Sequence, residues 1–163
     1  MAHIEKPRSK KANHEHAAGN QIQPKWPVWF FPEAPFGSAV KYIATLSPLF
    51  NWVGIYILKG NTLELGPYLG APSEHTRIPV GKGICGLAVS ENQDQNVAQV
   101  RENEHYLACS LETQSKLVIL IRDRAGKILG QIDIDSHTEN AFGKEEEKAV
   151  RKVAEELGRL WPE

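Results

Sequence analysis

Two aspartates and two cysteines are the residues of this sequence whose types and spacing could carry chemistry. Asp133 and Asp135 lie two residues apart in the apolar segment 130–136. If this segment is a strand, both carboxylates point to one face, because side chains alternate with a period of two. The other face would carry Ile128, Ile132 and Ile134. Carboxylates on the inner face of an apolar hairpin are costly unless something pairs or binds them. The alternative is a solvated sheet face.

The two cysteines, Cys85 and Cys109, are too few for a disulfide scaffold, and we expect them to be buried, unpaired or redox-active in a cytoplasmic protein. Cys85 follows the glycine-rich stretch 81–83 and would lie in a first helical turn, where unpaired N–H groups and the helix dipole favour a thiolate. A buried, inert cysteine is the alternative. His75, Cys85, His105 and Cys109 also offer metal ligands, but their spacing fits no standard zinc pattern, so we expect no metal.

The composition is that of an ordinary globular protein. The chain has 163 residues, of which 41% are apolar and 24% charged, and its net charge is −1. Such a balance does not steer the molecule toward nucleic acid or an anionic membrane. No apolar run reaches the roughly 18 residues of a membrane span, and the polar N-terminus does not resemble a secretory signal. We expect a disordered, polar and basic tail over residues 1–24 and one domain over residues 25–163. The aromatic segment 26–31 should lie against the domain or a partner subunit.

Periodicity predicts the elements that position these residues. Apolar spacing indicates three helices, one over 38–47, one that begins after Gly83 and one over 144–161. It indicates strands over 52–58, 63–69, 96–100 and 115–122, and a last strand that ends at residue 136. The turn 59–62 contains a Gly-Asn pair, which is a good hairpin signal. Trp52, Gly54 and Tyr56 would share one strand face, with space between the two rings above Gly54. This order of elements predicts an α+β sandwich around an antiparallel sheet.

The register of the last hairpin decides which charges meet. If the turn 123–126 is a four-residue loop, Arg122 pairs with Lys127 and Lys116 lies directly opposite Asp133. Opposite charges across two strands are well placed to pair. One aspartate would then be neutralised by Lys116.

Five segments, taken together, resemble a known family. They are 51–56, 65–68, 76–86, 107–109 and 132–136. In these segments the chain is similar to GAF domains and, more narrowly, to the free methionine-(R)-sulfoxide reductases built on that fold. The resemblance implies a GAF/PAS-like antiparallel sheet flanked by helices, with a ligand pocket roofed by loops. It also implies a homodimer paired through the first and last helices.

The resemblance also implies a mechanism. A cysteine matching Cys109 attacks the sulfoxide sulfur and becomes a sulfenic acid, Cys85 is a possible resolving partner, and thioredoxin is the external reductant, with no cofactor. Rings matching Trp52 and Tyr56 hold the thioether end. Carboxylates matching Asp133 and Asp135 hold the ammonium group and polarise the sulfoxide oxygen, and we assign the catalytic part to Asp135.

Two positions depart from the family pattern. His75 stands where the family usually has a third cysteine, often the resolving one, and Lys116 stands where it has a glutamate. The departures leave two hypotheses. The protein is a reductase of this family, or it is a non-enzymatic GAF domain that senses another small molecule near Lys116 and His75.

Overall fold

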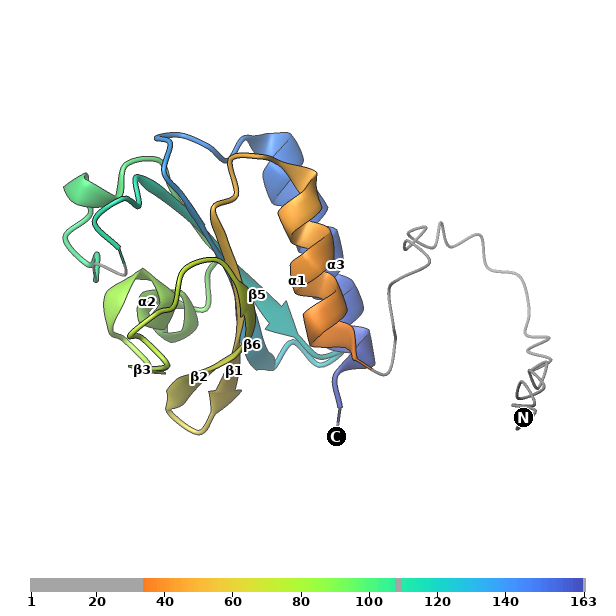
Figure 1. Cartoon of the computed structure of the whole chain (residues 1–163). Coiled ribbons are helices and arrows are strands. Elements are labelled where there is room, and N and C mark those ends of the chain that lie inside the picture. Colours follow the sequence, from red (N-terminus) through yellow and green to blue (C-terminus); the bar gives the residue numbers. More distant parts are fainter. Residues whose placement is uncertain (1–33, 108–109, 163) are drawn as a thin grey trace, which may run out of the picture.

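A single six-stranded antiparallel sheet organises the computed structural model, which describes residues 34–107 and 110–162 (Figure 1). The strand order across the sheet is β3-β2-β1-β6-β5-β4. The strands are β1 (Trp52–Lys59), β2 (Thr62–Leu69), β3 (Arg77–Pro79), β4 (Gln95–Val97), β5 (Ser115–Arg122) and β6 (Ile128–Ser136). Every adjacent pair is antiparallel.

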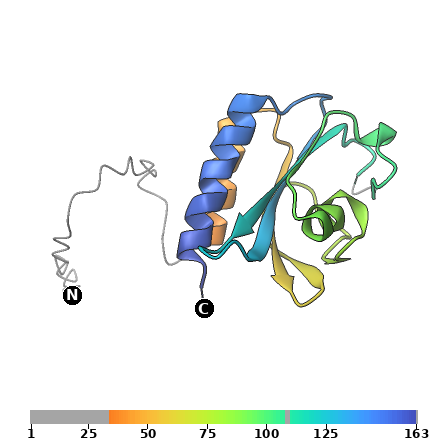
Figure 2. The ribbon, with the colours of Figure 1, turned by 180° about the vertical axis from the view of Figure 1, so that it is seen from behind.

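Helices cover the two faces of this sheet unequally. The helices α1 (Pro35–Leu46) and α3 (Lys144–Leu160) lie side by side and antiparallel across one face (Figures 1 and 2). The shorter α2 (Gly83–Glu91) lies on the opposite face, together with the loops that follow it. A short 3-10 turn, η1 (Val100–Glu102), precedes β5.

The predicted α+β architecture is confirmed, with small differences at the ends of elements. The two-residue turn at Gly60 and Asn61 joins β1 to β2, and Gly60 takes a φ of 60°, which glycine adopts at little cost. β5 has the predicted bounds and lies between two strands, as its apolar sequence indicated. The predicted strand 96–100 is shorter, and β3 was not predicted because three residues carry too little periodicity.

Two separate clusters of apolar side chains lie on the two faces. The larger one, which we call the helix-face core, lies between the sheet and α1 and α3 and includes Ile119, Ile132 and Ile134. The smaller one, which we call the site-face cluster, includes Trp52, Tyr56, Cys85 and residues of α2. Both faces of the central strands are therefore buried, but the buried charges, those of Lys116, Asp133 and Asp135, all lie on the site face.

The predicted register of the last hairpin is wrong by two residues. Lys116 pairs with Asp135, and Val118 pairs with Asp133. The turn is one residue longer than predicted, so that Arg122 lies opposite Ile128 instead of Lys127, and an irregularity between Ile121 and Arg122 shifts the pairing by one further residue.

The same irregularity moves Ile128 to the other face. Ile128 packs against the site-face cluster and does not share a face with Ile132 and Ile134. A bulge reverses the alternation of side chains beyond it, which a strict period of two does not foresee.

The predicted tail 1–24 and the aromatic segment 26–31 lie outside the described residues. Among the helices that are described, none combines the length and the apolar character needed to cross a membrane.

Candidate active site

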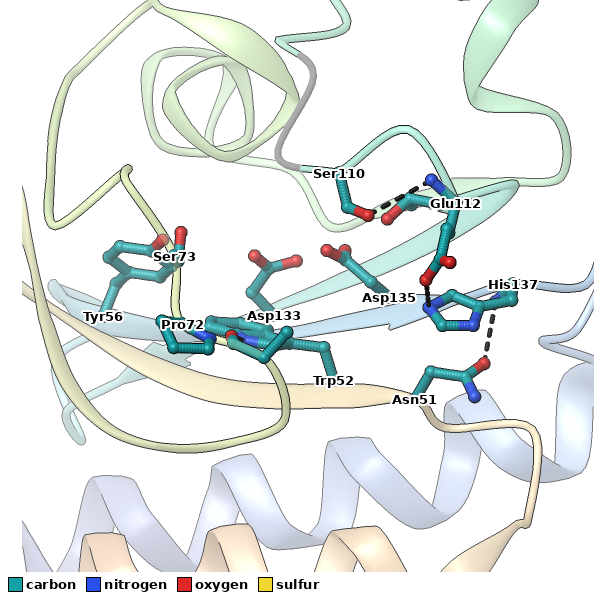
Figure 3. Close-up of a pocket in the computed structure, with 12 residues that line it drawn as sticks. Asn51, Trp52, Tyr56, Pro72, Ser73, Ser110, Glu112, Asp133, Asp135 and His137 are labelled. Carbon is teal, nitrogen blue, oxygen red and sulfur yellow. Dashed lines mark hydrogen bonds and ion pairs between the residues drawn. The ribbon is translucent and has the colours of Figure 1, made fainter.

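A pocket of about 210 Å³ opens on the α2 side of the sheet (Figure 3). Its floor comes from β1 and β6, and its walls and roof come from the loops 71–73 and 110–113. The lining residues are Asn51, Trp52, Tyr56, Ala71, Pro72, Ser73, Ser110, Glu112, Thr113, Asp133, Asp135 and His137. The pocket therefore combines aromatic rings with several acidic groups.

Aromatic rings form one end of the pocket. The indole of Trp52 lies over Gly54, where an added Cβ would overlap the ring, so the absence of a side chain makes room for it. Trp52 stacks on Tyr68 with centroids 5.6 Å apart, and its Nε1–H donates to the Ala71 carbonyl over 3.0 Å. The Tyr56 hydroxyl donates to the backbone carbonyl of His75 over 2.8 Å. With both polar tips anchored, the rings present apolar surface to a ligand.

Asp133 and Asp135 form the middle of the pocket, and both are held by one buried cation. The side chain of Lys116 is 2% exposed, and its Nζ lies 2.9 and 3.1 Å from the two carboxylate oxygens of Asp133. Nζ also lies 2.9 Å from Asp135 Oδ1, as an ion pair without hydrogen-bond geometry. With both aspartates ionised, the three groups together carry a net charge of −1. The pairing predicted from the sequence is thus present, with Lys116 between both aspartates.

Asp133 has a raised pKa, and burial is the main cause. It raises the pKa of Asp133 from its ordinary 3.8 to about 6, and the charge of Asp135 acts in the same direction. The ammonium group of Lys116 and a hydrogen bond with Cys85 act in the opposite direction and do not cancel the effect of burial. A carboxyl group with a pKa near 6 can donate a proton at a pH where an ordinary aspartate cannot.

Cys85 lies in a second, much smaller cavity. It occupies the first turn of α2, as predicted, and its side chain is buried. The cavity of about 10 Å³ is lined by residues of α2, by Tyr106 and Leu107, and by Lys116. Lys116 Nζ lies 3.9 Å from the Cys85 sulfur, so this one ammonium group contacts the thiol of the small cavity and the carboxylates of the pocket.

The structure brings together four of the eight residues that the sequence analysis singled out. Trp52, Tyr56, Asp133 and Asp135 line the pocket. Cys109 lies outside the described residues.

The other three do not line the pocket, contrary to expectation. Cys85 and Lys116 line the small cavity instead, and the Lys116 ammonium group contacts both the Cys85 sulfur and the aspartates of the pocket. His75 contributes its backbone carbonyl to Tyr56, while its side chain is outside the pocket lining.

Sequence reasoning missed three polar residues of this region. His137 and Glu112 lie at the end of the pocket away from Tyr56, with His137 Nε2 3.6 Å from Glu112 Oε2 (Figure 3). His137 could have been found, since it continues the alternation of Asp133 and Asp135 by one more step of two. Gln131, on the same face of β6, is fully buried, and both atoms of its side-chain amide lack a hydrogen-bond partner within the described residues.

The described residues contain no group of three or more His, Cys, Asp or Glu side chains able to hold a metal ion. One member of the hypothetical metal set, Cys109, lies outside these residues. The site is therefore described by its aromatic and acidic groups.

Comparisons with known proteins agree with this geometry. The family model of the GAF domain matches residues 41–160. The chain is 36% identical over 110 residues to the free methionine-R-sulfoxide reductase of Escherichia coli, a match covering 68% of this chain and 66% of that protein, just under two thirds of its length.

Two solved structures are similar as well. The type II free methionine-R-sulfoxide reductase from Thermoplasma acidophilum is 36% identical, with a TM-score of 0.74 over 79% of this chain and 93% of that one. The free methionine-R-sulfoxide reductase from Neisseria meningitidis, solved in complex with its substrate, is 26% identical, with a TM-score of 0.72 over 77% and 75%.

Proposed function

The chain belongs to the GAF domain family, and we propose that it is an oxidoreductase that reduces free methionine-R-sulfoxide to methionine. The observation that carries the proposal is the pocket itself, which places an aromatic wall beside two buried carboxylates. The rings of Trp52 and Tyr56 suit a methyl thioether, because sulfur and methyl groups pack favourably on aromatic surfaces. The carboxylates suit the ammonium group that a free amino acid has and an internal peptide residue lacks.

Cys109 is the proposed nucleophile. Its thiolate attacks the sulfoxide sulfur, the S–O bond of the substrate breaks, and the oxygen ends on the cysteine sulfur as a sulfenic acid. Methionine leaves, reduced by the two electrons that the cysteine sulfur supplies. Ser110, the residue that follows Cys109 in the sequence, lines the pocket, and this supports the assignment.

Cys85 is the proposed resolving cysteine. Its thiolate attacks the sulfenic sulfur of Cys109, an S–S bond forms, and the oxygen leaves as water. Tyr106 and Leu107, shortly before Cys109 in the sequence, line the small cavity of Cys85, while Ser110, just after it, lines the pocket. The described residues on the two sides of Cys109 in the sequence thus line the two cavities, which supports a reaction between Cys109 and Cys85. A thioredoxin dithiol then returns both cysteines to thiols and is itself oxidised to a disulfide.

The paired aspartates supply the proton that the leaving oxygen needs. Asp133 and Asp135 both lie against the ammonium group of Lys116, which holds the two carboxyl groups side by side in the pocket. The raised pKa of Asp133, caused by burial, leaves a proton available there near pH 6. Asp135 keeps the catalytic role assigned from the sequence, as the pair's member nearer the His137 end of the pocket (Figure 3).

A thioredoxin-coupled assay on the purified full-length protein tests this function. We expect NADPH consumption with free methionine-R-sulfoxide and none with the S epimer. Cys109→Ser should abolish turnover, whereas Cys85→Ser should release about one methionine per chain and then stop. Activity no higher than that of Cys109→Ser would exclude the reductase function.

A second function is favoured by the ion pairs of Lys116. An ammonium group 2.9 Å from each aspartate occupies part of the acidic surface that would bind the substrate's ammonium. A non-enzymatic GAF domain that binds another small molecule would account for this. In that case the assay above shows no turnover, while a small-molecule screen by thermal shift identifies a ligand whose effect depends on Lys116.

The remaining expectations stay part of the proposal. We propose a cytoplasmic homodimer that pairs through α1 and α3, which lie side by side and bring Phe36 and Trp161 into ring contact with centroids 4.7 Å apart. Light scattering at micromolar concentration should give the mass of two chains. A monomer mass would contradict the homodimer without affecting the pocket.

A further inference from the structure

His137 occupies the end of the pocket opposite Tyr56. Figure 3 shows Tyr56 at one end, Asp133 and Asp135 in the middle, and His137 with Glu112 at the other end. Asp133, Asp135 and His137 are spaced by two along the chain, and successive side chains on one face of a strand are about 6.8 Å apart. The pocket is therefore ordered along β6 from an aromatic end, through an acidic middle, to an imidazole end.

The side chains that line the pocket include more acidic groups than basic ones, and His137 differs from the acidic groups in its charge. Three of the lining side chains are carboxylates, those of Glu112, Asp133 and Asp135. Of the twelve residues that line the pocket in the described part of the chain, His137 is the one whose side chain can carry a positive charge. A free α-amino acid has an ammonium and a carboxylate on the same carbon. If the aspartates hold its ammonium, its carboxylate needs a donor a few ångströms further on.

Local contacts hold His137 in place and leave a ring nitrogen for a ligand. Its backbone N–H donates to Asn51 Oδ1 over 2.8 Å, which fixes the residue to the start of β1. Its Nε2 faces Glu112 Oε2 at 3.6 Å, and its side chain is 45% exposed. Nδ1 makes no hydrogen bond to any residue that the structure describes. An imidazole can donate from either nitrogen, so this edge can meet a carboxylate.

We propose that His137 binds the α-carboxylate of the amino-acid ligand and so selects free amino acids over amines of the same shape. The inference rests on the proposed function, since it takes the ligand to be methionine or its sulfoxide. It assigns to His137 a role in specificity and none in the chemical step. Removal of its side chain should therefore raise KM for methionine sulfoxide and leave kcat nearly unchanged.

The test compares two ligands that differ in one group. Calorimetry on the full-length protein would measure the affinities for L-methionine and for 3-(methylthio)propylamine, which lacks the carboxylate. We expect the unchanged protein to prefer methionine by about tenfold, the range of a partly exposed charged hydrogen bond. His137→Gln should lose this preference without weakening amine binding, and His137→Arg should retain it because it keeps a cationic donor.

His105 provides a matched control. It lies 3.5 Å from Glu104 and is 48% exposed, so it is a similar histidine–glutamate pair, but it does not line the pocket. His105→Gln should leave both affinities unchanged.

Three results would overturn the inference, and they are distinguishable. If the protein reduces the sulfoxide, but His137→Gln prefers methionine over the amine as strongly as the unchanged protein does, then only the role of His137 is overturned. An equal loss of preference in His105→Gln would show that the effect is one of net charge. Failure of the unchanged protein to bind either compound would overturn the proposed ligand class, and this inference with it.

Discussion

The two faces of the sheet are built from the same strands but contain different kinds of side chain. On the helix face, β5 and β6 contribute mainly apolar side chains, which pack against α1 and α3, and the polar exceptions are the small hydroxyls of Ser115 and Ser136 at the paired ends of the two strands. On the site face, the alternate positions of the same two strands include Lys116, Gln131, Asp133 and Asp135, all buried. The strands, and therefore the backbone hydrogen bonds, are common to both faces.

The helix face therefore stabilises the fold, whereas the site face contains buried charges that form the pocket and contribute less to stability. Burial of apolar area stabilises the helix face without any requirement for partners. Buried charges stabilise little even when they are paired, and they are strongly destabilising when one partner is removed. Substitutions at neighbouring positions of one strand should therefore differ in cost and in pH dependence, according to the face they belong to.

The largest effect is expected from the removal of the buried ammonium group. Lys116→Met leaves two buried carboxylates without a cation and should lower the free energy of unfolding by about 3–5 kcal/mol at pH 7.5. Leu117→Met introduces the same residue at the next position, which lies on the helix face, and should lower the free energy of unfolding by less than about 1.5 kcal/mol. Urea unfolding of both variants measures the difference. Equal costs at the two positions would show that Lys116 does not hold the aspartates in solution.

The next largest effect is a pH dependence of the free energy of unfolding that comes from the site face. Asp133 has a pKa of about 6 in the folded state and an ordinary value of 3.8, so between these values the folded state binds the proton more tightly. Its contribution to stability is therefore largest below about pH 4, decreases as the pH rises toward 6, and is constant above that. The change is on the order of 3 kcal/mol.

Unfolding free energies at pH 4.5 and pH 7.5 test this contribution. Asp133→Asn should remove it, so the unchanged protein should lose more stability than the variant when the pH is raised. Ile132→Val, a neighbouring substitution on the helix face, should show the same pH dependence of stability as the unchanged protein. The same pH dependence in Asp133→Asn and in the unchanged protein would contradict the assignment of the shift to Asp133.

The smallest effect concerns Gln131. Its side-chain amide is fully buried, and within the described residues it lacks hydrogen-bond partners, so Gln131→Met should raise the free energy of unfolding by about 1 kcal/mol. The neighbouring Ile132→Met, on the helix face, should lower it by less than about 1.5 kcal/mol. Thermal unfolding distinguishes a gain from a loss. A lower melting temperature for Gln131→Met would mean that the amide is satisfied in solution.

The sequence by itself determined the elements and most of the pocket floor. Apolar periodicity located β5 and α3 within a residue of their bounds, because both are long and strongly patterned. Alternation along β6 placed Asp133 and Asp135 on one face, and the spacing in β1 placed Trp52 and Tyr56 together. Such inferences depend only on local geometry, which the backbone repeats from residue to residue.

Only the tertiary structure decided which charges meet and which side chains reach the pocket. A longer turn and an irregularity at the end of the hairpin together set Lys116 opposite Asp135, and the irregularity moved Ile128 to the other face. Lys116 contacts both Cys85, which lies in the small cavity, and the aspartates of the pocket, and a loop brought Glu112 beside His137. Register and side-chain direction follow from the packing of all strands and loops at once. The hydrophobic pattern excludes a shift of one residue, which would exchange the two faces of a strand, but it does not exclude the shift of two residues found here, which keeps them.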